Sequence, residues 1–170
     1  MNVPAAKARV LFVDDEPRVL TTMRMLFRAH YEVYFAEGGT QALELLRKQP
    51  VDVVVSDQRM PGMSGIELLR AARELNPNAM RILLTGYSDL NAIIGSINEG
   101  EIFRFVNKPW SNEDLSTTVA RAVTAARVSA AATARSSDET VTRTTRRSVM
   151  VRAPRPRRRS RRASAGLSRG

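Results

Sequence analysis

The segment Val51-Asp52-Val53-Val54-Val55-Ser56-Asp57 is a nearly continuous valine run that ends in an acidic side chain. A short apolar run with little polar alternation is typical of a strand whose two faces are both covered by helices, as in a parallel sheet. We therefore predict a strand at residues 51–55 inside a parallel sheet, with Asp57 just beyond its carboxyl end.

Three other short apolar segments also end in polar residues. They are 10–13 before Asp14-Asp15, 81–84 before Thr85, and 102–107 before Lys108-Pro109. Because the carboxyl ends of parallel strands share one edge of a sheet, we expect three carboxylates, a hydroxyl and an ammonium to converge there. Clustered acids can bind a hard cation, and a carboxylate beside an ammonium can accept a phosphoryl group. This pattern predicts a phosphorylation switch.

The segments between these strands carry apolar residues at helical spacing. A further strand is predicted at 31–36, and the predicted helices lie at 17–29, around 42–46, around 66–72, around 90–97 and at 112–126. Pro50, Asn76-Pro77 and Gly100 end three of these helices. Five strand–helix units predict an α/β fold, a doubly wound five-stranded parallel sheet with helices on both faces.

The net charge of +10 is concentrated near the carboxyl terminus of the chain. Residues 1–126 contain 14 Lys and Arg against 15 Asp and Glu, whereas residues 127–170 contain 13 against 2. The overall charge is therefore misleading as a sign of nucleic-acid binding, because the globular part is close to neutral.

Residues 128–170 form a separate region by composition, rich in Arg, Ser, Ala and Thr, and we predict a disordered basic tail there after a domain at residues 1–127. Its basic residues are all arginine, which is also typical of GC-rich DNA translated in a shifted frame. An accidental end that replaces an output domain is therefore a live alternative to a native tail.

The chain has no cysteine, so disulfides and thiolate metal sites are excluded. Residues 1–7 lack the features of a signal peptide, and no later apolar run reaches membrane-spanning length. We expect a cytoplasmic protein that makes no membrane contact.

The order of the motifs Asp14-Asp15, Ser56-Asp57, Leu84-Thr85-Gly86 and Lys108-Pro109 resembles the receiver domain of bacterial two-component response regulators, over roughly residues 7–126. The strings SDQRMP at 56–61, LLTGYSD at 83–89 and VNKPW at 106–110 resemble one branch of that family. Its members are joined to hydrogenase-type transcription regulators, to cyclic-di-GMP phosphodiesterases or to kinase modules. The resemblance implies the flavodoxin-like strand order 2-1-3-4-5 and leaves the output open.

The resemblance also implies roles for individual residues. Asp57 is expected to accept a phosphoryl group, with Lys108 and Thr85 contacting the phosphoryl oxygens. Phe105 matches the switch aromatic of the family, and Pro109 matches its cis-proline.

A Mg²⁺ site is implied at the same edge. The expected ligands are the side chains of Asp14, Asp15 and Asp57 and the backbone carbonyl of Arg59, with Asp14 acting largely through water. Such a set suits Mg²⁺, which retains waters and takes few carboxylates.

The expected partners are a sensor histidine kinase or a phosphotransfer protein, and a second copy of the chain through the face made by helix 4, strand 5 and helix 5. We expect no enzyme activity beyond self-phosphorylation from small donors and self-dephosphorylation. A second reading is a DNA-binding regulator, in which the tail makes weak nonspecific contact with nucleic acid. A third is a metal-dependent phosphatase, which the residues Gln58-Arg59 disfavour because the second acid of such enzymes is missing.

Overall fold

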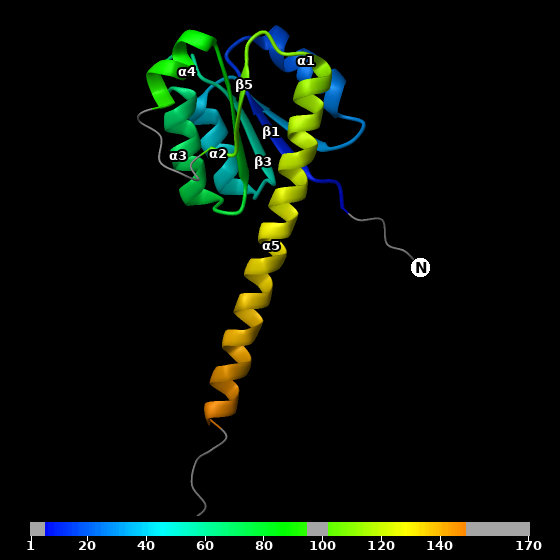
Figure 1. Ribbon diagram of the computed structural model, residues 1–170, viewed down its shortest axis with the longest axis vertical. Coiled ribbons are helices and arrows are strands. Elements are labelled where there is room, and N and C mark those ends of the chain that lie inside the picture. Colours follow the sequence, from blue (N-terminus) through cyan, green and yellow to red (C-terminus); the bar gives the residue numbers. More distant parts are fainter. Residues whose placement is uncertain (1–5, 95–101, 149–170) are drawn as a thin grey trace, which may run out of the picture. The chain divides into compact units, whose positions relative to one another are not determined.

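The computed structural model describes residues 6–94 and 102–148, and it describes side chains as far as residue 136 (Figure 1). The strands form one parallel sheet in the order β2-β1-β3-β4-β5. Their bounds are β1 Arg9–Val13, β2 Glu32–Ala36, β3 Val53–Asp57, β4 Met80–Thr85 and β5 Arg104–Asn107. The predicted fold class and strand order are confirmed.

Helices follow the strands in alternation. They are α1 Pro17–Phe27, α2 Gly39–Lys48, α3 Gly65–Leu75, α4 Tyr87–Ile93 and α5 Asn112–Ser148. Pro17 occupies the first turn of α1, and the Ser111 hydroxyl accepts the Asp114 N–H at the start of α5. The predicted continuation of α4 through Ile97 to Gly100 lies outside the described residues.

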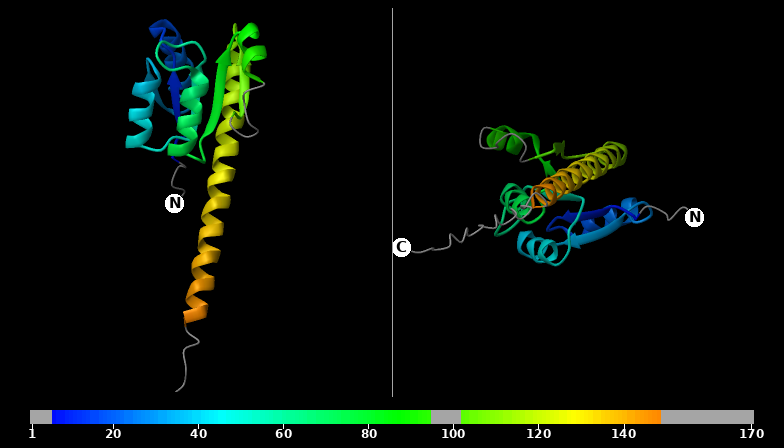
Figure 2. Two further views of the ribbon diagram at one scale, coloured as in Figure 1. Left: turned by 90° about the vertical axis from the view of Figure 1, so that its left-hand side faces the viewer. Right: turned by 90° about the horizontal axis from the view of Figure 1, so that it is seen from below.

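Both faces of the sheet are covered by helices (Figure 2). Alternate residues of β3 explain this arrangement, because Val53 and Val55 belong to the apolar cluster that includes α1 and α5, whereas Val54 belongs to the cluster that includes α2 and α3. All three valines are at most 1% exposed. The unbroken valine run is therefore the consequence of a strand buried on both sides.

Strands β3 and β4 end later than their apolar runs predicted. β3 was expected at 51–55 and lies at 53–57, so Asp57 is its last residue and is paired in register with Leu84. Thr85 likewise ends β4 and is paired with Asn107 of β5. Asp57 and Thr85 thus stand on the last residues of their strands, whereas Asp14, Asp15 and Lys108 lie just beyond β1 and β5.

Gly65, the first residue of α3, lies directly against the carboxyl end of β3. A Cβ atom on Gly65 would lie 2.2 Å from the Asp57 carbonyl oxygen and 2.7 Å from Leu83 Cδ1. The Gly65 N–H donates to the Gln58 carbonyl at 3.0 Å, and a Ser64–Glu67 capping box fixes the helix start. Only glycine permits this approach of α3 to the strand that carries Asp57.

Helix α5 continues past Arg127, where the sequence predicted no regular structure. The reason lies in helix propensity, since neither glycine nor proline occurs between Pro109 and Pro154 and alanine is frequent. The prediction relied on apolar periodicity, which reports burial, and Val128 is indeed 66% exposed. The chain divides into compact units at residues 1–134 and 135–170, so the first unit ends inside α5. Residues 149–170 of the predicted tail lie outside the described residues.

Contacts of α5 with the first unit continue beyond the predicted boundary at 127. Arg127 Nη2 donates to the Ala6 carbonyl at 2.8 Å, and the hydroxyls of Ser129 and Thr133 each lie 3.4 Å from Asn78 Oδ1. Within the described part of the chain, none of the helices combines the length and the apolar character needed to cross a membrane.

Replacing Gly65 by alanine should destabilise the protein by about 1–3 kcal/mol, because the new methyl group overlaps the backbone of β3. The free energy of unfolding in urea measures this effect. The matched control is Gly38→Ala, where a Cβ atom meets nothing within 4 Å and the loss should stay below about 1 kcal/mol. Equal losses in the two variants would contradict the close approach of α3 to Asp57.

Candidate functional site

Three acidic side chains meet at the carboxyl edge of the sheet. Asp14 and Asp15 follow β1 and Asp57 ends β3, and one carboxylate oxygen of each lies within 4.8 Å of the others. Asp14 and Asp57 are buried, whereas Asp15 is exposed. The convergence predicted from the strand ends is present in the structure.

Asp14 carries a carboxylate oxygen that lacks a hydrogen-bond partner. Its Oδ1 accepts the Glu16 N–H at 2.9 Å, but Oδ2 is buried without such a partner in the described structure. Burial is the main cause that raises the Asp14 pKa above its ordinary value of 3.8, and the charges of Asp57 and Asp15 add to it against the opposing effects of the Glu16 N–H and Lys108. A cation would satisfy this oxygen and offset the repulsion among the three acids, so these residues fit a hard divalent ion.

Lys108 supplies the positive charge of the site. It follows β5 directly, and its Nζ lies 2.6 Å from Asp57 Oδ1 and 3.8 Å from Asp14 Oδ2. Burial lowers the Lys108 pKa, but the hydrogen bond to Asp57 and the nearby acidic charges outweigh burial, so the net shift is upward and the side chain stays an ammonium. The Lys108 N–H donates to the Thr85 carbonyl at 2.9 Å, and the Lys108–Pro109 bond is cis, as the family resemblance implied.

Thr85 faces the same space as the acids and the lysine. Its side chain is buried, and its hydroxyl donates to the Gly86 carbonyl at 3.3 Å. A cavity of about 310 Å³ is lined by Thr85 together with Asp57, Lys108 and neighbouring residues. The cavity therefore combines a carboxylate, an ammonium and a hydroxyl, the groups that phosphoryl transfer to an aspartate needs.

Phe105 lies on β5 three residues before Lys108 and is paired in register with Leu83. Its ring is partly buried and packs on the apolar cluster that includes α2 and α3. The structure thus places Phe105 on the strand that pairs with β4, the strand that carries Thr85. The role of Phe105 as a switch stays a prediction.

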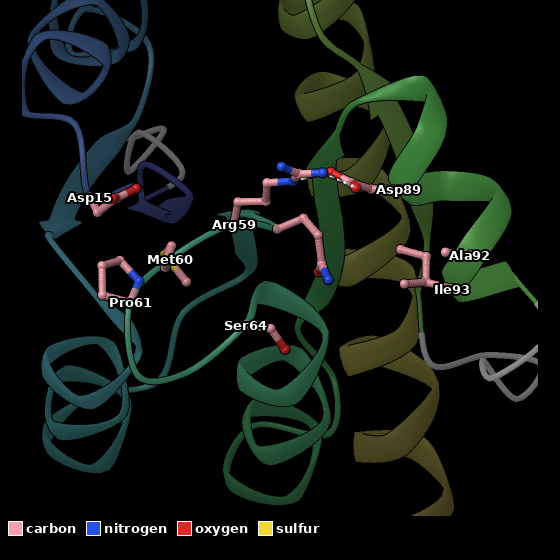
Figure 3. Close-up of a pocket in the computed structure, with 9 residues that line it drawn as sticks. Asp15, Arg59, Met60, Pro61, Ser64, Asp89, Ala92 and Ile93 are labelled. Carbon is pink, nitrogen blue, oxygen red and sulfur yellow. Dashed lines mark hydrogen bonds and ion pairs between the residues drawn. The ribbon is translucent and has the colours of Figure 1, made fainter.

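Arg59 has a partner that the sequence did not predict. Its Nε and Nη2 donate to the two carboxylate oxygens of Asp89, each at 2.6 Å, and Figure 3 shows the two side chains pointing toward one another. This hydrogen bond from Arg59 is the main cause that lowers the Asp89 pKa. No periodicity or motif spacing links residues thirty positions apart, so sequence reasoning could not find the pair.

The loop after β3 also borders a second, wider hollow. It has a volume of about 570 Å³ and lies between that loop and α4 (Figure 3). Its lining includes Asp15, Met60, Ser64 and Ile93. The loop itself is held by the Gln58 side chain, whose Oε1 accepts the Ile66 N–H at 3.1 Å; the sequence had marked Gln58 only as the absence of a second acid.

Comparison with known proteins identifies related sequences. Residues 10–120 match the response regulator receiver domain family. The hydrogenase transcriptional regulatory protein HoxA of Cupriavidus necator is 40% identical over 119 residues, which cover 70% of this chain and 25% of HoxA. Sporulation initiation phosphotransferase F of Bacillus subtilis is 31% identical over 108 residues, which cover 63% of this chain and 86% of that protein. The chain spans about a quarter of the length of the hydrogenase regulator.

Solved structures of related sequence share the fold. The response regulator protein TrrA from Thermotoga maritima, in complex with Mg²⁺-BeF, has a TM-score of 0.60 and 32% sequence identity. The similarity covers 68% of this chain and 98% of TrrA. The parallel sheet, the acidic cluster at its edge and the match over residues 10–120 together show that the chain belongs to the response regulator receiver domain family of two-component systems.

Proposed function

We propose that the chain is the phosphoacceptor of a two-component phosphorelay in the cytoplasm, and that Asp57 receives the phosphoryl group from a sensor histidine kinase or a phosphotransfer protein. The observation that carries this proposal is the 2.6 Å contact between Lys108 Nζ and Asp57 Oδ1 inside the acidic cluster. An ammonium there orients the nucleophile at rest and remains beside the oxygens of the incoming phosphoryl group.

The transfer begins when a carboxylate oxygen of Asp57 attacks the phosphorus of a phosphohistidine. The new P–O bond forms as the P–N bond breaks, and the electron pair of the broken bond stays on the imidazole nitrogen, which then takes up a proton. Lys108 neutralises charge on one phosphoryl oxygen, while the Thr85 hydroxyl can turn from the Gly86 carbonyl to donate to another. Self-dephosphorylation by water is the only further reaction in this proposal.

The same edge would hold Mg²⁺. The proposed ligands are Asp14 through water, the side chains of Asp15 and Asp57, and the Arg59 backbone carbonyl. The bound ion supplies positive charge that offsets the repulsion between the acids and a phosphoryl dianion. The buried Asp14 oxygen without a hydrogen-bond partner supports this proposal, as does the Mg²⁺-BeF complex of TrrA.

The proposed switch couples Thr85 to Phe105. The two residues lie on adjacent strands in which Leu83 pairs with Phe105 and Thr85 with Asn107. Movement of Thr85 toward a phosphoryl oxygen would leave space for the half-buried Phe105 ring to turn inward. Phosphorylation then shifts the population between two arrangements of the face made by α4, β5 and α5.

Replacing Asp57 by asparagine should abolish phosphorylation, because the amide cannot act as the nucleophile. With acetyl phosphate and Mg²⁺, intact-mass measurement should show one added phosphoryl group on the parent chain and none on Asp57→Asn. Asp52→Asn is the matched control, since Asp52 lies before the same strand and outside the acidic cluster, and it should label like the parent. Equal labelling of Asp57→Asn would place the acceptor elsewhere.

Replacing Asp14 by asparagine should stabilise the metal-free protein by about 1–3 kcal/mol at pH 7, because it removes a charge from a buried oxygen that has no hydrogen-bond partner. The Asp14 pKa is raised on folding, so the folded state binds more protons and this penalty grows as pH rises from 3.8 through the raised value. The gain in urea unfolding should therefore be complete at neutral pH and disappear in acid.

The same variant should lose most of the stabilisation that saturating Mg²⁺ gives to the parent. A variant that is less stable than the parent without metal, or that keeps the full response to Mg²⁺, would contradict the role given to Asp14.

A second copy of the chain is the proposed partner of the α4–β5–α5 face. Three exposed apolar side chains belong to α4 or directly flank α4 and β5, namely Tyr87, Ile94 and Phe103. Arg104, Asp114 and Arg121 offer charged contacts there, whereas Glu99 lies outside the described residues.

Sedimentation velocity should show a shift from monomer toward dimer when Mg²⁺ and beryllium fluoride, a mimic of the phosphoryl group, are added. Ile94→Glu should prevent the shift, because it places a charge on the apolar face. Met25→Glu is the control, since Met25 is also well exposed, 66% against 55% for Ile94, but lies on α1. An unchanged mass at every accessible concentration would make a monomeric switch the better description.

A further inference from the structure

The Arg59–Asp89 pair ties the loop after β3 to the first turn of α4. Both hydrogen bonds are 2.6 Å long and use both oxygens of Asp89, so the guanidinium plane has a defined orientation (Figure 3). Asp89 lies within the first turn of α4, where it also suits the helix dipole. The pair therefore connects two elements that follow different strands of the sheet.

Helix α4 depends on such contacts more than the other helices do. None of its residues Tyr87–Ile93 is fully buried, although Ile93 is partly buried against the apolar cluster that includes α2 and α3, whereas α3 buries Ile66, Leu68, Leu69 and Ala72. A helix that buries so little apolar surface is held weakly and is drawn from the least stable part of a domain. Loss of the tie to Arg59 is thus expected to affect α4 more than α3.

The pair also stands at the phosphorylation site. Arg59 and Asp89 line the same cavity of about 310 Å³ as Asp57 and Lys108. The Arg59 pKa is raised chiefly by its hydrogen bond to Asp89 and by the Asp89 charge, and the charge of Asp57 contributes as well. The guanidinium is therefore already within electrostatic reach of the proposed acceptor.

Phosphorylation changes which anion attracts Arg59 more strongly. At rest, Asp89 offers one negative charge, and an ion pair whose arginine side chain is 76% exposed contributes little to stability. A phosphoryl group carries about two negative charges and three acceptor oxygens. Because a guanidinium binds phosphate in the same bidentate manner as carboxylate, the dianion competes for Arg59 from within the same cavity.

We infer that Asp89 is a positioning residue of the phosphorylation site: it holds the Arg59 side chain at rest and yields it to the phosphoryl group on Asp57, so that phosphorylation releases α4 from the loop after β3. This inference rests on the proposed function of Asp57. It assigns the Arg59 side chain a role separate from that of its backbone carbonyl, and it gives α4 a direct link to the charge on Asp57.

The partner exchange predicts how variants bind Mg²⁺-beryllium fluoride. Trp110, the only tryptophan, lies with its ring centre 5.7 Å from Lys108 Nζ and can report binding by fluorescence at saturating Mg²⁺. Asp89→Asn should bind the mimic about two- to fivefold more tightly than the parent, because Arg59 no longer has a competing carboxylate. Arg59→Ala should bind more weakly than the parent.

The double variant Arg59→Ala/Asp89→Asn should bind like Arg59→Ala, since Asp89 acts only through Arg59. Glu32→Gln is the matched control. It breaks an exposed ion pair between Glu32 and Arg9, the first residues of β2 and β1, at the end of the sheet opposite the acidic cluster. This variant should bind like the parent. Unchanged or weaker binding by Asp89→Asn, or an effect of Asp89→Asn that persists without Arg59, would overturn the inference.

Hydrogen exchange tests the release of α4 independently. Beryllium fluoride should speed exchange of the amides at residues 87–94 in the parent and in Glu32→Gln. In Asp89→Asn these amides should already exchange quickly before the mimic is added. If the parent binds the mimic and α4 is not released, the inference alone is wrong. If the parent does not bind the mimic at all, the proposed function fails and the inference fails with it.

Discussion

The parallel pairing of β3 with β1 on one side and β4 on the other is the constraint on which the rest of the structure depends. Because helices cover both faces of β3, this strand carries only uncharged side chains until it reaches the carboxyl edge of the sheet. Asp57, at that edge, is the first of its side chains that can carry a charge. The neighbouring strands reach the same edge. A linear pattern of apolar runs with polar ends thereby brings these side chains to one edge, where Asp57, Thr85 and Lys108 line a cavity.

The charges at that edge of the sheet explain why a receiver can respond to a single phosphoryl group. Asp14, Asp15 and Asp57 repel one another, and Lys108 alone does not neutralise them. The site is therefore poised to bind a cation and is sensitive to any further change of charge. An acidic cluster with one buried oxygen that lacks a hydrogen-bond partner costs stability in the metal-free protein, and under the proposed function that cost would couple metal binding to folding.

Sequence reasoning succeeded where one residue pattern determines the outcome. The strand order followed from a family resemblance, and the meeting of Asp57 with Lys108 followed from strands that end at one edge. It did not find the Arg59–Asp89 pair, because that contact depends on where α4 begins and on two side-chain rotamers. It also ended α5 too early, since a helix without an apolar stripe leaves only propensity as a signal.

A crystal structure of the chain with Mg²⁺ and beryllium fluoride tests the central claim most directly. We predict a fluoroberyllate on an Asp57 carboxylate oxygen, with Lys108 Nζ and the Thr85 hydroxyl on its fluorine atoms and Mg²⁺ beside Asp15. Fluoroberyllate bound to another residue, or an Asp57 that keeps its ion pair with Lys108 while both reagents are present in excess, would contradict the assignment of Asp57 as the phosphoacceptor.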